Sequence, residues 1–372
     1  MTFRPPEVAA ILFIGVIGVL IPGLQPQLLG ALAAEGRISV NALGPLATVE
    51  LLAMGAAAGG ANFVLPADRL RPIAALALLA SVALDASSPS LATGGLFAAR
   101  IGAGLAEGTL IWLVIAFIVR RHRPERWSGI YLALQTAGQF AVASLLGLLV
   151  ADSGAGFTTL AIVTIAGLIA VPLLPRAYAP IVAADEAGGA IPARGYLALL
   201  GALLMLAGAV AVWVYVEPLG LQRGVPPGLL RVVAPLSLAM QVLGAGVASV
   251  LADRLRARIV MAGMLVADLL VLALMAAPPT PIMFVAATAA FGFLWLFAMP
   301  FQVPLVVAAD PSRRAALLIG GAQLTGSSLG PLIAAQLVSA RDLLPVLRFG
   351  AVALAVGIGL LIGVGRPRPR TA

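Results

Sequence analysis

The sequence has no cysteine, no lysine and only one histidine among its 372 residues. Without cysteine the chain has no disulfide framework, no thiolate metal site and no cysteine nucleophile. Charged residues are also scarce: they make up 10% of the chain, whereas soluble domains have about 25%. So few charges cannot cover a water-exposed surface. The composition therefore excludes an ordinary soluble protein.

Long apolar runs are abundant instead, because 61% of the residues are hydrophobic. A hydrocarbon core about 30 Å thick requires about 20 apolar residues in a helix. The third run is the weakest, since Asp85 and the serine-rich segment 87–90 shorten it. We predict an all-α membrane protein of about twelve transmembrane helices, at residues 8–33, 42–65, 72–90, 91–119, 127–150, 156–175, 195–217, 227–251, 258–277, 281–308, 314–338 and 343–364.

All 23 basic residues are arginines, and their placement predicts the orientation of the chain. If both termini are cytoplasmic, seventeen arginines lie on the cytoplasmic side, five lie on the other side, and Arg100 lies within a span. Short loops rich in arginine remain cytoplasmic. We therefore expect a multi-pass protein of the cytoplasmic (inner) membrane, with both termini in the cytoplasm.

An internal repeat divides the chain into halves. The stretch Ala-Asp-Arg-Leu-Arg occurs at 67–71 and again at 252–256, an offset of 185 residues. Similar offsets relate Trp112 to Trp295 and Gln135 to Gln323. We predict two pseudo-symmetric six-helix bundles, 1–175 and 195–372, joined by a central cytoplasmic linker at 176–194, with a short cytoplasmic tail after the last helix.

Two local motifs resemble the major facilitator superfamily, and the resemblance extends over the whole chain. The family's loop between helices 2 and 3 carries an Asp-Arg pair flanked by glycines; this chain keeps Asp68 and Arg69 but lacks both glycines. Arg100 with Gly104 resembles a helix 4 motif of the family that is associated with proton-coupled members. The antiporter signature of helix 5 is absent.

The resemblance implies a secondary transporter that works by alternating access, with its solute site between the two halves. We expect proton-coupled efflux of an amphipathic or aromatic compound, with proton-coupled uptake of a small metabolite as the alternative. The expected partners are a small-molecule substrate, protons and the lipid bilayer. We expect no nucleic acid, no cofactor, no metal and a monomer.

Two other function classes compete with a carrier. A membrane-embedded enzyme would need a catalytic cluster, but the single histidine, His122, lies in the loop 120–126, and no metal-ligand or nucleophile motif accompanies it. A channel would conduct passively, whereas the two-half repeat favours a carrier.

Ionisable residues within spans are costly and are therefore candidates for function. Arg100 and Glu107 are seven residues apart, so they share one helix face at a separation of about 10 Å and are not expected to touch. Glu50 lies at a depth comparable with that of Glu107. We expect Glu50, Arg100 and Glu107 to form the proton-coupling site.

Each of these charges also has a structural interpretation. Arg100 can bond to backbone carbonyls of a neighbouring helix, and Gly104 with Gly108 has the spacing of a close-packing face. Asp268 can pair with Arg348 or Arg231, and Glu217 can lie at the membrane interface.

Neutral polar and aromatic residues within spans complete the candidates for the solute pathway. Pro22 and Pro26 predict a kink in the first span that frees backbone carbonyls. Interhelical hydrogen bonds and interface belts are the alternative roles of such residues. The pathway candidates are Gln25, Gln27, Gln135, Gln139, Trp112, Trp295 and Gln323. The repeated loops predict a cytoplasmic gate formed by Asp68, Arg69, Asp253 and Arg254.

Overall fold

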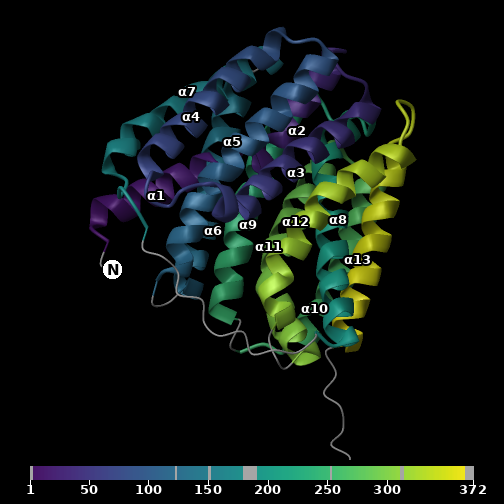
Figure 1. The fold of residues 1–372 in the computed structure, drawn as a ribbon. Coiled ribbons are helices and arrows are strands. Elements are labelled where there is room, and N and C mark those ends of the chain that lie inside the picture. The colour runs from purple at the N-terminus through teal and green to yellow at the C-terminus, as the bar shows by residue number, and fades with distance from the viewer. Residues whose placement is uncertain are drawn as a thin grey trace, which may run out of the picture. The chain divides into compact units, whose positions relative to one another are not determined.

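The computed structural model describes residues 3–121, 124–149, 152–178, 191–251, 254–310 and 314–364, and these residues are almost entirely helical (Figure 1). Two short 3-10 turns, η1 (Ser88–Ser90) and η2 (Val171–Leu173), follow α4 and α7. The helices are α1 (Pro5–Ile17), α2 (Leu20–Ala34), α3 (Val40–Val64), α4 (Leu70–Ser87), α5 (Thr93–Val119), α6 (Pro124–Leu148), α7 (Ser153–Ala170), α8 (Ala193–Gln222), α9 (Pro227–Leu251), α10 (Ala257–Ala276), α11 (Pro281–Ala309), α12 (Arg314–Leu337) and α13 (Leu344–Val364).

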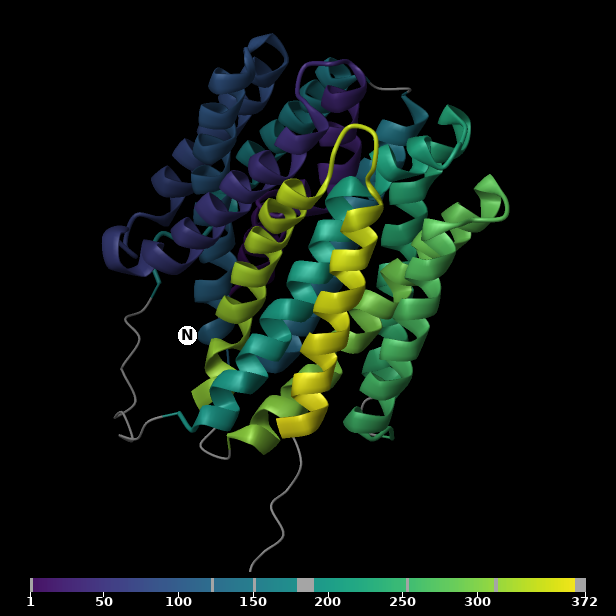
Figure 2. The ribbon, with the colours of Figure 1, turned by 90° about the vertical axis from the view of Figure 1, so that its right-hand side faces the viewer.

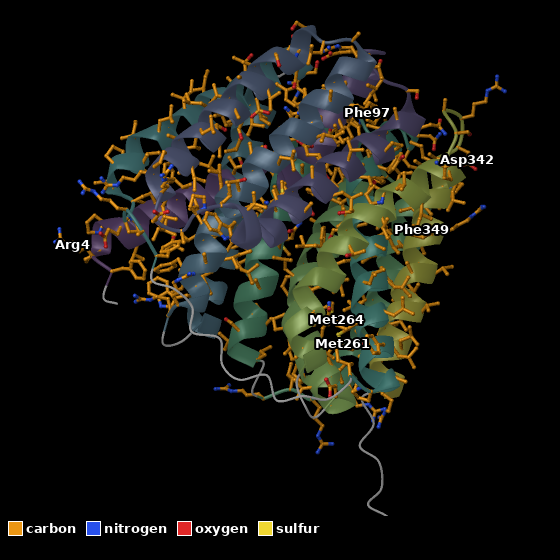
Figure 3. The ribbon with its side chains drawn as sticks, viewed as in Figure 1. Arg4, Phe97, Met261, Met264, Asp342 and Phe349 are labelled. Atoms are coloured by element: carbon orange, nitrogen blue, oxygen red, sulfur yellow. The ribbon has the colours of Figure 1, made fainter. Side chains whose placement is uncertain are left out.

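Eleven helical segments in the described part of the chain are long and apolar enough to cross a membrane. α12 is not one of the eleven; it is of similar length but carries Gln323, Thr325 and Ser328 along its middle. The eleven segments and α12 together confirm the prediction of about twelve helices. Large apolar side chains such as Ile169 (79% exposed) lie on the outside, and carbon-rich side chains line the flanks of the helices (Figure 3).

The first span is broken, as its prolines predict. α1 and α2 together form the segment Pro5–Ala34, and the helix is interrupted at Gly18 and Val19. The break lies four residues before Pro22, where a proline ring collides with the carbonyl of residue i−4. Next to the break, the carbonyl of Val19 accepts a hydrogen bond from Gln139 Nε2 at 2.6 Å.

The chain divides into two compact units. Unit 1 comprises Met1–Ile38 and Val49–Glu186, and unit 2 comprises Ser39–Thr48 and Ala187–Ala372. In unit 1, α4 packs on α5 and α7, while the broken first span packs on α5, α6 and α7. In unit 2, α10 packs on α11 and α13, while α8 packs on α11, α12 and α13 (Figure 2). The same set of helix neighbours therefore occurs in each unit.

Small residues allow the helix backbones within each unit to approach closely. A Cβ atom added to Gly104 of α5 would lie 2.3 Å from the carbonyl oxygen of Glu50 in α3, and one added to Gly108 would lie 2.2 Å from that of Met54. The close-packing face expected from this glycine pair is therefore present. In unit 2, a Cβ at Gly330 of α12 would lie 2.0 Å from the carbonyl oxygen of Ala207 in α8.

The first turns of α3 belong to unit 2, although the rest of this helix belongs to unit 1. Asn41 Nδ2 donates to the carbonyl of Val338 at 2.8 Å, and the Thr48 hydroxyl donates to that of Ser328 at 2.7 Å. The backbone N–H of Gly44 donates to the hydroxyl oxygen of Tyr215 at 3.1 Å. The sequence did not predict this division of α3.

The contact between α8 and α12 can be tested with two glycines of α12. Gly330→Ala should destabilise the fold by about 1–3 kcal/mol, because its Cβ collides with backbone. The control, Gly320→Ala, places its Cβ in open space and should stabilise the helix by about 0.5–1 kcal/mol. Thermal unfolding in detergent measures both. Equal effects of the two substitutions would contradict the close contact.

Candidate functional site

Arg100 of α5 is fully buried and binds two carboxylates within unit 1. Its Nη1 donates to Glu50 Oε1 of α3 at 2.9 Å, and its Nη2 donates to Asp85 Oδ1 of α4 at 2.7 Å. Nη2 also donates to the hydroxyl oxygen of Ser88 at 3.0 Å. The two ion pairs each join α5 to a different helix.

An aromatic ring from α7 covers the same guanidinium. The Arg100 Cζ atom lies 4.9 Å from the ring centroid of Phe157, which is within the range of a cation–π interaction. Phe157 is 1% exposed, so the ring shields the cation from solvent. Arg100 therefore connects four elements of unit 1, namely α3, α4, α5 and α7.

The buried cluster contains more acidic groups than basic groups. Glu107, on the same face of α5 as Arg100, is 4% exposed, and its Oε2 has no hydrogen-bond partner. Asp85 Oδ2 also lacks a partner. One guanidinium balances one full negative charge, and an unbalanced buried charge is costly. Because the three carboxyl groups Glu50, Asp85 and Glu107 accompany one guanidinium, ionisation of all three would leave buried negative charge without a cation.

Sequence reasoning found part of this cluster and missed the rest. The structure brings Glu50 to Arg100, and it shows no direct contact between Arg100 and Glu107, in agreement with their spacing. Arg100 bonds to carboxylates and a hydroxyl, so the alternative of a lock on backbone carbonyls is wrong. Asp85 and Ser88 were interpreted only as interruptions of a span. Their signal was an acidic residue within an apolar run, followed three residues later by a hydroxyl on the same helix face.

The glutamines of unit 1 have mixed surroundings. Gln27 donates to the carbonyl of Ala143 at 3.1 Å and Gln139 donates to that of Val19, so both make the interhelical bonds of the alternative interpretation. Gln25 is 1% exposed, and neither amide atom has a partner. Gln135 is half-buried. Trp112 is 1% exposed within the apolar core of unit 1, which is a packing position and not a pathway surface.

A strip of aromatic and amide side chains follows one face of α11 in unit 2. Trp295, Met299 and Gln302 are spaced at i, i+4 and i+7 and therefore share that face. Trp213 of α8 lies edge-on to Trp295, with 6.4 Å between the ring centroids, and Trp295 Nε1 is buried without a partner. Gln323 Nε2 of α12 donates to Gln302 Oε1 at 3.0 Å. We call these five residues the α11 strip.

Two further acidic residues lie apart from the Arg100 cluster. Asp268 of α10 is 3% exposed and has no ion pair in the described residues, so the expected pair with Arg348 or Arg231 is not formed. Its Oδ1 has no hydrogen-bond partner. Glu217 is half-buried and precedes Pro218 near the end of α8.

The predicted gate residues are not joined by ion pairs in the described part of the chain. Asp68, Arg69 and Arg254 have exposed side chains, and Asp253 lies outside the described residues, as does His122. The loop itself is held by its backbone, because Tyr178 N donates to the carbonyl of Ala67 at 2.8 Å. Burial raises the pKa of the Tyr178 hydroxyl, which remains a neutral donor to the Leu113 carbonyl at 2.8 Å. The gate stays a prediction.

Comparison with known proteins identifies the fold. No protein-family model and no curated protein matches the sequence. The solved structure of a mutant of the nucleoside transporter NupG superimposes with a TM-score of 0.75 at 13% identity, covering 96% of this chain and 99% of that one. This chain has the fold of the major facilitator superfamily.

A second structure with the major facilitator fold agrees. A bacterial homologue of the human lysosomal transporter Spinster, in an inward-facing and unoccupied conformation, matches with a TM-score of 0.63 at 13% identity. The match covers 98% of each chain. The expected fold class of two six-helix bundles is thereby confirmed.

The electrostatic role of Arg100 can be tested through stability. Arg100→Met should destabilise the protein by about 3–5 kcal/mol, because it leaves buried carboxylates without their cation. Adding Glu50→Gln and Asp85→Asn should recover part of that loss. The control Arg231→Met, at an exposed position of α9, should change stability by no more than about 0.5 kcal/mol. An Arg100→Met protein as thermally stable as wild type would contradict this assignment.

Proposed function

We propose that this protein is a secondary active transporter that moves a small solute across the membrane by alternating access. The major facilitator fold, matched over nearly the full length of two transporters, supports transport rather than catalysis. The repeated helix packing of the two units also supports it, because paired bundles are a known architecture for carriers. Arginine placement favours the cytoplasmic membrane with both termini in the cytoplasm, and we propose a monomer.

Proton coupling is the second part of the proposal, and the buried cluster around Arg100 is the observation that carries it. Glu50 and Asp85 share one guanidinium, while Glu107 has an unpaired oxygen nearby on the same helix. A movement that strengthens or weakens the Arg100 contacts changes the stability of the ionised carboxylates, and this drives proton release or uptake. Each proton that crosses contributes about 2.3 kcal/mol per 100 mV of membrane potential.

For the solute, we propose an amphipathic or aromatic compound that contacts the α11 strip. The strip offers the half-buried ring of Trp295 and the half-buried amide of Gln323, backed by the buried side chains of Trp213 and Gln302, and it contains no charged residue. The unpaired Nε1–H of Trp295 favours a solute with a hydrogen-bond acceptor on its ring. A nucleoside has such a ring, and one protein with the same fold is a nucleoside transporter.

We propose efflux as the direction, exchanging the solute for incoming protons. Proton-coupled uptake is the alternative, and it would use the same buried cluster. Imposed pH gradients of both signs in proteoliposomes distinguish the two, with ethidium as an amphipathic aromatic probe and uridine as a neutral one. Accumulation on the acidic side indicates exchange with protons, and accumulation on the alkaline side indicates symport.

The carboxylate that carries the proton can be identified by substitution. The variants are Glu50→Gln, Asp85→Asn and Glu107→Gln, whose side chains cannot titrate. One of them replaces the carboxylate that carries the proton. Gradient-driven transport should therefore disappear, while solute exchange without net proton movement should survive. Arg100→Lys should impair both activities, because lysine keeps the charge but cannot bond to both carboxylates in a fork. Glu7→Gln, at the start of α1, serves as the control.

If all four variants kept the wild-type dependence on pH, the proposed proton site would be wrong, and Asp268 would become the next candidate. Loss of both driven transport and exchange in one carboxyl variant would assign that residue to binding or folding.

The solute assignment has its own test on α11 and α12. Trp295→Phe keeps an aromatic ring but removes the Nε1–H donor, and Gln323→Ala removes one amide of the strip. Each should raise the KM for the transported probe about 3- to 10-fold, the value of one hydrogen bond, with little change in kcat. Gln336→Ala, at an exposed position of α12, is the matched control. Unchanged KM values in both strip variants would exclude the strip from solute binding.

A further inference from the structure

One arginine joins three loops at the end of unit 1 where the α2–α3, α4–α5 and α6–α7 connections meet. Arg37 Nη2 donates to the carbonyl of Leu91 at 2.8 Å and to that of Ser88 at 3.2 Å. Its Nη1 donates to the hydroxyl oxygen of Ser153 at 3.4 Å. Arg37 itself is half-buried, and its carbonyl accepts a bond from the Thr93 hydroxyl at 3.3 Å.

The third loop is held from both sides. Ser153 N donates to Glu35 Oε1 at 2.6 Å, and the Ser153 hydroxyl donates to Glu35 Oε2 at 2.5 Å. Glu35 and Arg37, which lie in the same short loop, thus both form hydrogen bonds with Ser153, the first residue of α7. We call Glu35, Arg37, Ser88, Leu91 and Ser153 the Arg37 clamp.

Ser88 belongs both to the clamp and to the buried cluster. Its carbonyl accepts from Arg37, while its hydroxyl oxygen accepts from Arg100 Nη2 at 3.0 Å. The Ser88 hydroxyl donates to the carbonyl of Leu84 at 2.7 Å, which leaves its oxygen oriented toward Arg100. Ser88 is 0% exposed. Ser88 therefore links Arg37 directly to Arg100.

The clamp also lies where the chain passes from one unit to the other. Arg37 is two residues before Ser39, the first residue assigned to unit 2, and the hydrogen bonds of Asn41 and Thr48 hold the start of α3 there. Gly36, next to Arg37, has a φ of +70°, a conformation that favours glycine. A displacement of the start of α3 would therefore act directly on Arg37.

We propose that Arg37 is a positioning residue that sets the proton affinity of the buried cluster through Ser88, and so links the start of α3 to protonation. The inference rests on the proposed proton coupling. When Arg37 holds the Ser88 turn, Arg100 is held against Asp85 and Glu50. When the clamp opens, the guanidinium is less well placed to stabilise the ionised carboxylates, and they bind protons more readily.

The elements packed around Arg100 contribute few other charged groups. The helix α7 carries no charged residue and supplies Phe157, whereas Tyr131 of α6 donates to the Gly15 carbonyl at 2.9 Å. In α1 and α2 the one acidic residue is Glu7, in the first turn of α1. The charged residues of the cluster and the clamp are Arg100, Glu50, Asp85, Glu107, Glu35 and Arg37. Asp152, next to Ser153, caps α7 by accepting from Ala155 N at 2.7 Å.

Infrared titration of the reconstituted full chain tests this link without a solute. The band of interest is the carboxylic-acid C=O band that is lost in Asp85→Asn, Glu50→Gln or Glu107→Gln. Arg37→Gln should move its midpoint to higher pH by about 0.5–1 unit, because a poorly placed guanidinium stabilises the carboxylates less. Arg37→Lys keeps the positive charge but lacks the planar guanidinium, so it should move the midpoint by a smaller amount. This variant replaces Arg37→Gln as the test if Arg37→Gln does not fold.

A double variant separates positioning from a long-range charge effect. Ser88→Ala removes the contact between the turn and Arg100, so adding Arg37→Gln to it should produce little further shift. The control is Arg223→Gln, in the α8–α9 loop of unit 2, which should leave the midpoint unchanged.

Three results would overturn the inference. An unshifted midpoint in both Arg37 variants would show that the clamp does not act on the cluster. A shift by Arg37→Gln of equal size with and without Ser88 would exclude the proposed route. A wild-type cluster that shows no titrating carboxyl band at all would reject the proton site itself, and with it both proposals, whereas the first two results leave proton coupling intact.

Discussion

The interactions of the buried Arg100 guanidinium connect the helices of unit 1. It holds Glu50, Asp85 and Ser88 from neighbouring elements and lies against Phe157 of α7. A buried ion pair is weak support for stability by itself, because desolvation offsets much of the attraction. Its cost is easier to explain by function. Under the proposed function, the three carboxyl groups beside this cation are the groups that take up and release protons.

Close packing of α3 against α5 positions this cluster. Gly104 and Gly108 allow α5 to pack directly on the backbone of α3, which fixes Glu50 beside Arg100. The start of α3 is part of unit 2, and the loop before it carries Arg37. We propose that a change at that junction reaches the cluster through the hydrogen bonds of Arg37 and Ser88. Coupling between solute movement and protonation needs a connection of this kind.

Much of the fold could be predicted from the sequence, because a span is defined by length and apolar composition and needs no partner. Arg100, Glu50 and Glu107 were recognisable for a similar reason, since charge within a span is rare. Contacts between helices were harder. Gln139 and Trp112 were expected on the pathway but contact backbone and core, because sequence spacing does not say which face a residue presents. Asp85 was missed because its partner is fifteen residues away on another helix. The division of α3 depends on tertiary contacts that the start of the helix makes within unit 2.

The measurement that tests the central claim most directly is the proton movement that accompanies solute flux. Wild-type protein is reconstituted with a pH-sensitive dye inside the vesicles, a solute gradient of ethidium or uridine is imposed without any initial pH gradient, and internal pH is followed. The account predicts that the internal pH changes in proportion to the flux of a transported probe. For exchange, protons leave the vesicles as the probe enters, so the internal pH rises. Solute movement with no change in internal pH would contradict it.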